Sequence, residues 1–322
     1  MSDIDIGGHA MSEEREGFEI RKNCSRKKLI DDGNSRYTTL RRALKNNSVL
    51  GGGAIVLGFL LVLLFAPWVA PHDPLEMDIM NTLKAPVFLE GGNSQHLLGT
   101  DELGRDLLSR LIYGMRLSFF ISFCSVLIIV LFGSAIGVFA GYYGGLTNTL
   151  LMRLTDVQLS FPIVILAVAM LSVWTSTVFT MILVLSIANW PIYARVTRGL
   201  TITEKIKDYV TAARVVGASD GRVMLRYISS NILPSILVVS ILDLAGMVIW
   251  EAVLGFIGLS ILPPTPTLGN IMGDGKNYMV IAWWISTLPG IVMFFLLLGF
   301  MLLADGLTAS IGARGQRQVV VI

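Results

Sequence analysis

The sequence contains few charged side chains. Asp, Glu, Lys and Arg make up 15% of its 322 residues, against about 25% in soluble domains, while 53% are hydrophobic. No charge occurs between Arg116 and Arg153 or between Asp156 and Arg195. Uncharged apolar runs of about 18 or more residues are typical of membrane spans. We therefore predict a polytopic membrane protein of all-α class, since helices satisfy their own backbone groups in lipid.

Cysteine and histidine are also scarce. Cys24 lies in a polar segment and Cys124 in an apolar run, so no disulfide is expected. The three histidines, His9, His72 and His96, are far apart in the sequence, and their spacing predicts no metal site.

Motifs for nucleotide binding and catalysis are missing. The Gly275-Lys276 pair is followed by Asn277 and lacks the earlier glycine of a P-loop. There is no H-E-x-x-H, and no G-x-S-x-G turn follows a soluble strand. We expect no enzyme activity, no cofactor in this chain and no nucleic-acid partner.

Six apolar segments are long enough to predict membrane spans. They cover residues 50–70, 117–140, 154–173, 178–192, 233–259 and 281–303. Of the 25 Lys and Arg residues, 20 lie in the two terminal segments, at Arg153 or between Arg195 and Arg226. Positive charge favours the cytoplasmic side, so both termini are predicted to be cytoplasmic.

This arrangement divides the chain into four segments. Residues 1–48 form a mostly disordered cytoplasmic tail, and 49–116 contain the first span and a long external loop. Residues 117–310 form the main membrane core, including a cytoplasmic loop at 197–230, and 311–322 form a C-terminal tail.

The loop at 197–230 contains a helix, a break and a second helix. Tyr209, Ala213 and Val216 are spaced to share one helix face. Gly217 suits a helix C-terminus, and Ser219 or Asp220 suits the next N-cap. Such a loop is either an amphipathic helix at the membrane surface or a docking element for a cytoplasmic partner.

The segment 211–217, Thr-Ala-Ala-Arg-Val-Val-Gly, resembles the coupling motif of ABC importer permeases. Thr211 stands where the usual motif has Glu, and Asn231 ends an Ile-Ser-Ser-Asn rather than the common Ile-Leu-Pro-Asn. The resemblance implies ATPase-coupling residues Thr211, Ala212, Ala213, Arg214, Gly217, Ala218, Ser219 and Asp220.

Residues 96–116 resemble the signature of C-type permeases of dipeptide, oligopeptide and nickel importers, and further similar stretches occur at 251–260, 263–270 and 304–307. The external signature residues are Gly99, Thr100, Asp101, Gly104, Arg105, Asp106, Ser109 and Arg110. Leu103, Leu107 and Leu111 recur every four residues, which predicts a helix over 101–110 with Thr100 as its N-cap.

The resemblance implies a permease subunit of an ATP-driven importer in a bacterial or archaeal inner membrane. It also implies a second permease subunit, an external binding protein, and two ATPase subunits that hold ATP and Mg²⁺. Di- or oligopeptides are the expected cargo, with nickel complexes, glutathione or sugars as alternatives. A secondary transporter or a non-transporting structural subunit are the rival hypotheses.

Acidic residues inside the predicted spans are candidates for special roles, because charge in lipid is costly. Asp243 and Glu251 are candidates for the pathway or a gate, with a packing role as the alternative. Asp156 lies three residues after Arg153, which predicts a local ion pair.

Overall fold

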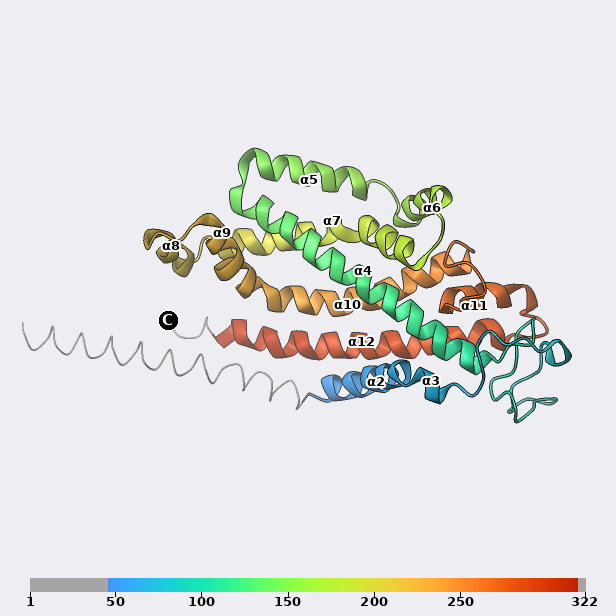
Figure 1. The fold of residues 1–322 in the computed structure, drawn as a ribbon. Coiled ribbons are helices and arrows are strands. Elements are labelled where there is room, and N and C mark those ends of the chain that lie inside the picture. The colour runs from blue at the N-terminus through green and yellow to red at the C-terminus, as the bar shows by residue number, and fades with distance from the viewer. Residues whose placement is uncertain (1–45, 318–322) are drawn as a thin grey trace, which may run out of the picture. The chain divides into compact units, whose positions relative to one another are not determined.

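The computed structural model describes residues 46–317, with side chains to residue 309 (Figure 1). Within this range the chain is helical with connecting loops, and an isolated bridge between Thr100 and Asp106 is the only β pairing. The all-α prediction is confirmed. The tail predicted at 1–48 lies almost entirely outside the described residues.

The chain divides into two units, residues 51–304 and a unit made of the two terminal segments. In the second unit, Gly306 packs against Val49. The longer helices are α2 (Asn47–Leu64), α4 (Leu107–Tyr143), α5 (Gly145–Leu159), α6 (Ile163–Val173), α7 (Val178–Lys205), α10 (Ser229–Phe256) and α12 (Trp284–Arg317). The shorter elements are α3 (Ala66–Val69), η1 (Ile79–Asn81), α8 (Asp208–Val215), α9 (Asp220–Arg222), η2 (Val223–Ile228), α11 (Leu268–Gly275) and η3 (Lys276–Tyr278).

Five helical stretches of the described residues are long and apolar enough to cross a membrane, and the bent pair α5–α6 makes a sixth candidate. Several helices extend beyond the predicted spans. Helix α4 begins at Leu107 and α7 continues to Lys205, which places the first part of the 197–230 segment inside a helix. Helix α12 continues to Arg317, into the segment predicted as a C-terminal tail.

The predicted third span is two helices instead of one. Helices α5 and α6 meet at 83° across a short break at residues 160–162. Pro162 lacks a backbone N–H and disfavours helical geometry at the preceding Phe161, so the helix ends before it. The break makes this pair either a broken span or a re-entrant segment.

Helices α4 and α7 form the most extensive helix pair of the 51–304 unit, and a stripe of glycines lets them pack closely. A Cβ at Gly133 would lie 2.7 Å from the Trp190 carbonyl oxygen, and one at Gly137 would lie 2.5 Å from that of Ala194. Gly141 meets α7 in the same way. Small residues four apart let two membrane helices approach closely.

An ion pair joins α5 to α7. Arg195 Nη2 lies 2.5 Å from Asp156 Oδ1, and both side chains are about half exposed. The predicted pairing of Asp156 with Arg153 is therefore wrong. Arg153, three residues earlier on the same helix, competes with Arg195 on the neighbouring helix for the Asp156 carboxylate. The packing of α5 beside α7 brings Arg195 directly to that carboxylate.

Candidate functional site

The predicted signature residues of 99–110 lie at the end of the 51–304 unit where α4 begins (Figure 1). Gly99 and Gly104 have φ angles of +81° and +75°. A Cβ on Gly99 would lie 2.4 Å from the Lys84 carbonyl oxygen, and one on Gly104 would lie 1.8 Å from that of Asp78. Both turns therefore require glycine, because of backbone conformation and because of space.

The predicted helix over 101–110 is wrong in its first half. The chain makes a turn there, and α4 starts at Leu107 with Asp106 as its N-cap. Asp101 Oδ1 accepts from the backbone N–H groups of Leu103 and Arg105, both at 2.9 Å. An aspartate that binds nearby N–H groups competes with helix formation, and Gly104 adopts a left-handed conformation that a helix excludes.

Thr100 does not cap a helix, contrary to the prediction, but anchors the long loop. Its hydroxyl donates to the Asn81 carbonyl oxygen at 2.5 Å and accepts from the Lys84 N–H at 2.8 Å. The Thr100 side chain is fully buried. Thr100 therefore ties the end of the loop to the last residue of η1 and to Lys84, near the middle of the loop.

Five charged residues form an ion network beside this turn, and the three at its centre are buried. Asp101 Oδ2 lies 2.7 Å from Arg105 Nε and 3.2 Å from Arg110 Nε. Arg105 also pairs with Glu102 at 3.1 Å, and Arg110 Nη2 lies 3.4 Å from Asp274 Oδ2 on α11. The side chains of Asp101, Arg105 and Arg110 are at most 4% exposed.

Burial raises the pKa of both outer carboxyls of this network, Glu102 and Asp274. The neighbouring Asp101 carboxylate raises the pKa of Glu102 further, whereas the Arg110 and Arg105 guanidinium groups act in the opposite direction on Asp274. The network links the start of α4 to α11, a contact that no local sequence pattern indicated.

Asp106 joins the two ends of the long loop to α4. Its Oδ2 accepts from the Ser109 N–H at 2.8 Å and the Ser109 hydroxyl at 2.7 Å. Its Oδ1 lies 3.0 Å from His96 Nδ1 and 3.7 Å from His72 Nδ1. The two imidazole rings lie side by side, with centroids 4.9 Å apart. Sequence spacing did not indicate this grouping.

The predicted coupling residues lie at the opposite end of the 51–304 unit, on α8 and the turn before α9 (Figure 1). Helix α8 ends before Gly217, whose φ is +90°, and Ser219 occupies the N-cap position of α9, as predicted. Helix α9 continues through the π-helical η2 into α10. The helix–break–helix prediction is confirmed for this segment.

The buried face of α8 differs from the predicted one. Val210 is fully buried and Ala213 is 8% exposed, whereas Val216 is 89% exposed. Residues three apart share a helix face, and the helix ends before Val216 could join it. Thr211, Ala212, Arg214 and Val215 are exposed, so Ala212 is available to a partner while Ala213 packs within the chain.

Tyr142, at the end of α4, holds the coupling segment in place. Its hydroxyl donates to Asp220 Oδ1, and its carbonyl oxygen accepts from Lys205 Nζ. The Arg214 guanidinium lies 5.1 Å from the centre of its ring, a favourable cation–π distance. Sequence reasoning missed this residue; its place two residues before the Gly144 turn was the available signal.

Tyr209 fixes the start of α8 to the end of α7. Its hydroxyl donates to Glu204 Oε1 at 2.6 Å, and Lys207 Nζ lies 2.6 Å from Glu204 Oε2. Burial and the bond to this carboxylate raise the pKa of Tyr209. Helix α8 is thus attached to α4 through Tyr142 and to α7 through Glu204.

Glu251 and Asp243, the candidate pathway or gate residues, occupy different environments on α10. Glu251 is fully buried and accepts from the Ser260 hydroxyl at 3.0 Å. Asp243 is half-buried, and its Oδ2 has no hydrogen-bond partner among the described residues. The Tyr193 hydroxyl on α7 also has none there. The pathway or gate role of each residue remains a prediction.

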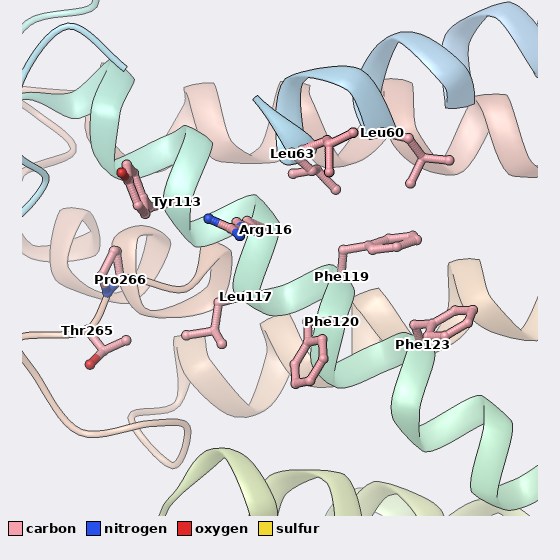
Figure 2. Close-up of a pocket in the computed structure, with 11 residues that line it drawn as sticks. Leu60, Leu63, Tyr113, Arg116, Leu117, Phe119, Phe120, Phe123, Thr265 and Pro266 are labelled. Atoms are coloured by element: carbon pink, nitrogen blue, oxygen red, sulfur yellow. The ribbon is translucent and has the colours of Figure 1, made fainter. Parts of the chain in front are cut away.

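A pocket of about 600 Å³ lies between α2 and α4. Figure 2 shows Leu60 and Leu63 of α2 facing the aromatic side chains of α4, with Arg116 of α4 to one side; Thr265 and Pro266 complete the lining. Apart from Arg116, the lining is almost entirely apolar.

A family comparison identifies residues 133–314, more than half of the chain, as a binding-protein-dependent transport system inner membrane component. The chain belongs to this family. Residues 37–86 also match the N-terminal transmembrane domain of oligopeptide transport permease C. This confirms the resemblance to the oligopeptide-type permeases.

Curated relatives agree with this assignment. The permease is 38% identical over 270 residues to the dipeptide transport system permease protein of Haemophilus influenzae, covering 84% of this chain and 92% of the relative. It is 40% identical over 269 residues to the di/tripeptide transport system permease protein of Pseudomonas aeruginosa, covering 84% and 89%. A glutathione transport system permease protein of Pectobacterium atrosepticum is 33% identical over 277 residues, covering 85% and 89%.

This permease is a multi-pass membrane subunit of an ABC importer that works with a binding protein. The function predicted from the resemblance is confirmed at this level. A secondary transporter that works alone is not supported, since the family is defined by its dependence on a binding protein.

Proposed function

We propose that this permease carries short peptides, together with a homologous second permease subunit, two cytoplasmic ATPase subunits and an extracytoplasmic binding protein. Relatives named for dipeptides and di/tripeptides are 38% and 40% identical to it, which supports a peptide cargo. Glutathione, nickel complexes and sugars remain the alternative cargoes. The ATPase subunits, rather than this chain, bind ATP and Mg²⁺ and perform hydrolysis.

Helix α8 and the following turn are the proposed docking site for an ATPase subunit. The supporting observation is an exposed apolar pair: Val215 is 82% and Val216 is 89% exposed. Thr211, Ala212 and Arg214 are exposed beside them. An apolar surface with a small residue and one cation suits a groove on a protein partner better than solvent.

The anchoring of α8 supports a route from this site to the membrane helices. A displacement of α8 acts on Tyr142 at the end of α4 through Arg214 and on Glu204 near the end of α7 through Tyr209. Those two helices pack closely along the glycine stripe. ATP binding would then shift α8, α4 and α7 between two positions, provided that the ATPase binds the two positions with different affinity.

The proposed topology places both termini and α8 in the cytoplasm, and the 70–106 loop outside. Of the 25 Lys and Arg residues, the 20 on the predicted cytoplasmic side support this orientation. Single cysteines introduced at the exposed positions Val216 and Val280 test it. We expect a membrane-impermeant maleimide to label Val280→Cys in intact cells and Val216→Cys only after permeabilisation; the reverse pattern contradicts the topology.

Within the membrane, Asp243 is the better pathway candidate. It is half-buried, whereas Glu251 is fully enclosed, and each has one carboxylate oxygen without a hydrogen-bond partner among the described residues. We expect Asp243→Asn to change transport without preventing assembly, and Glu251→Gln to act through packing. Equal transport by wild type and Asp243→Asn would leave Asp243 without a pathway role.

The docking proposal is tested by co-expressing the permease with its neighbouring subunits and measuring substrate-stimulated ATP hydrolysis in proteoliposomes. Gly217→Asp places a side chain at a φ of +90° in the docking turn. Gly199→Asp is the control, because Gly199 is exposed on α7 and a Cβ there meets nothing within 4 Å. We expect Gly217→Asp to lose coupled hydrolysis and Gly199→Asp to retain it. Normal coupling in both variants would mean that the turn is a passive surface feature.

The cargo proposal needs a separate measurement. Labelled dipeptide is supplied with the cognate binding protein to the reconstituted importer, and unlabelled dipeptide, glutathione, a sugar or a nickel chelate is added as competitor. We expect dipeptides to compete most strongly. If only glutathione, the sugar or the nickel chelate competes, that compound replaces peptides as the proposed cargo. The conclusion about ATPase docking would not be affected.

A further inference from the structure

Three side chains with metal-binding atoms meet where the long loop joins α4. His72 comes from the loop after α3, His96 from the loop before α4, and Asp106 caps α4. Their ligand atoms all lie within 4.8 Å of one another. Asp106 Oδ1 lies 3.0 Å from His96 Nδ1 and 3.7 Å from His72 Nδ1.

Ser109 holds two of these three residues in place. Ser109 occupies Asp106 Oδ2 through its N–H and its hydroxyl, at 2.8 and 2.7 Å, which leaves Oδ1 facing the two imidazoles. Such bonds to the non-coordinating oxygen are typical of the groups that orient metal ligands. His72 is held by its backbone N–H, which donates to the Ser109 hydroxyl at 3.1 Å.

Of the two histidines, His96 has a hydrogen-bond partner for its Nδ1 atom among the described residues, and His72 does not. His96 Nδ1 lies within hydrogen-bond distance of Asp106. His72 Nδ1 is also shielded from solvent but has no hydrogen-bond partner among the described residues. An unsatisfied buried nitrogen that faces a carboxylate and a second imidazole needs an explanation.

We propose that His72, His96 and Asp106 bind a divalent transition-metal ion, with Zn²⁺ as the probe. Zinc binds His nitrogen at about 2.0–2.1 Å and carboxylate oxygen at about 2.0–2.2 Å, usually with tetrahedral geometry. Ligand atoms around such an ion are about 3.3 Å apart. The distances of 3.0 and 3.7 Å from Asp106 Oδ1 to the two imidazoles are close to this value, and the two imidazole ligand atoms, which lie within 4.8 Å of each other, would move together on binding. The fourth position is open to water.

The ion ties together the two ends of the loop between α3 and α4. His72 is among the first residues of that loop, and Asp106 is the last one before the helix. Binding to the folded chain alone would stabilise this end of the permease in proportion to the occupancy of the site. The site is far along the chain from α8, and the proposal does not depend on the transported cargo.

The test uses the full chain in detergent, purified with an affinity tag that contains no histidine. Zn²⁺ affinity is measured by competition with a chromophoric chelator, and the bound ion is examined by X-ray absorption at the zinc edge. We expect one tight site with nitrogen and oxygen neighbours that include two imidazoles. We also expect the thermal unfolding temperature to rise with Zn²⁺ and to fall after chelation.

His72→Ala is the most informative variant, because His72 Nδ1 has no hydrogen-bond partner within residues 46–309 that the fold would lose. We expect it to weaken Zn²⁺ binding at least about tenfold, since even outer-shell partners are worth 10- to 100-fold. His96→Ala should do the same. Asp106 is avoided because its substitution would uncap α4.

The matched control is the double variant His9→Ala/Cys24→Ser, which removes the other histidine and the terminal cysteine. We expect it to bind Zn²⁺ as the wild type does. The proposal is overturned if the wild type binds no Zn²⁺ more tightly than the His72→Ala variant does. It is also overturned if only the control variant loses binding, or if the bound ion has sulfur neighbours.

Discussion

Asp101, Arg105 and Arg110 point inward and form a buried ion network at the start of α4, whereas most side chains of α8 and its following turn point outward. The first set is at most 4% exposed, and Val216 in the second is 89% exposed. Both segments resemble permease motifs. The contrast shows that the 99–110 motif specifies contacts inside the chain, whereas the α8 motif specifies an exposed surface.

The two regions also differ in what holds them. The 99–110 segment depends on charges that cannot reach water, so each partner is needed by the others. Helix α8 is attached at its two ends through Tyr209 and Tyr142, with an exposed face between. Substitutions in the first region should therefore affect stability, and those in the second should affect partner binding.

The largest expected effect is that of Asp101→Asn. This change leaves Arg105 and Arg110 buried without their closest counter-charge. Breaking one side of a buried pair costs about 3–5 kcal/mol, so we expect a large fall in the thermal unfolding temperature in detergent. Asp274→Asn is the control: its side chain is 38% exposed and lies 3.4 Å from Arg110, so the loss should be smaller. Equal losses would contradict a network centred on Asp101.

Gly104→Ala and Gly217→Ala compare the same change in the two regions. Both glycines have positive φ, which costs a non-glycine residue about 1–2 kcal/mol. At Gly104 a Cβ would also lie 1.8 Å from the Asp78 carbonyl oxygen, whereas at Gly217 it meets nothing within 4 Å. Overpacking adds about 1–3 kcal/mol, so thermal unfolding should show clearly greater destabilisation for Gly104→Ala. A similar loss in both variants would mean that the 99–110 turn relaxes easily.

Tyr142→Phe should have a moderate effect. The change removes the hydroxyl that donates to Asp220 and keeps the ring beside Arg214. Loss of one hydrogen bond costs about 0.5–1.5 kcal/mol. We expect nearly normal assembly, with fewer peptides transported per ATP hydrolysed in proteoliposomes. An unchanged ratio would show that coupling does not depend on the bond between Tyr142 and Asp220 of α9.

Val216→Glu should have the smallest effect on stability and a strong effect on association. The side chain is 89% exposed, and surface substitutions usually change stability by less than about 0.5 kcal/mol. We expect the permease to fold normally but to co-purify with less ATPase. Val280→Glu, 97% exposed near α11, is the control and should retain the ATPase. Loss of ATPase from both variants would argue against a specific surface at α8.

Much of the fold was predictable because membrane spans are a local property of composition. Five of the six apolar segments correspond to single helices of membrane length, and the third corresponds to the bent pair α5–α6. Gly217 and Ser219 occupy the predicted positions at the break after α8. The predictions that failed concern competition between local and distant partners. Asp101 turned the chain away from a helix, and Arg195 replaced Arg153 as the partner of Asp156.

The sequence by itself determined the class of this protein: charge-free apolar runs are stable only as helices in lipid, and two long motifs specify the permease family. The tertiary structure decided which side chains meet. Tyr142 meets Asp220, Arg110 meets Asp274, and His72 meets His96 at Asp106. These contacts join residues distant in the chain. They depend on how closely α4 and α7 pack and where the loops return, which no periodicity within one segment encodes.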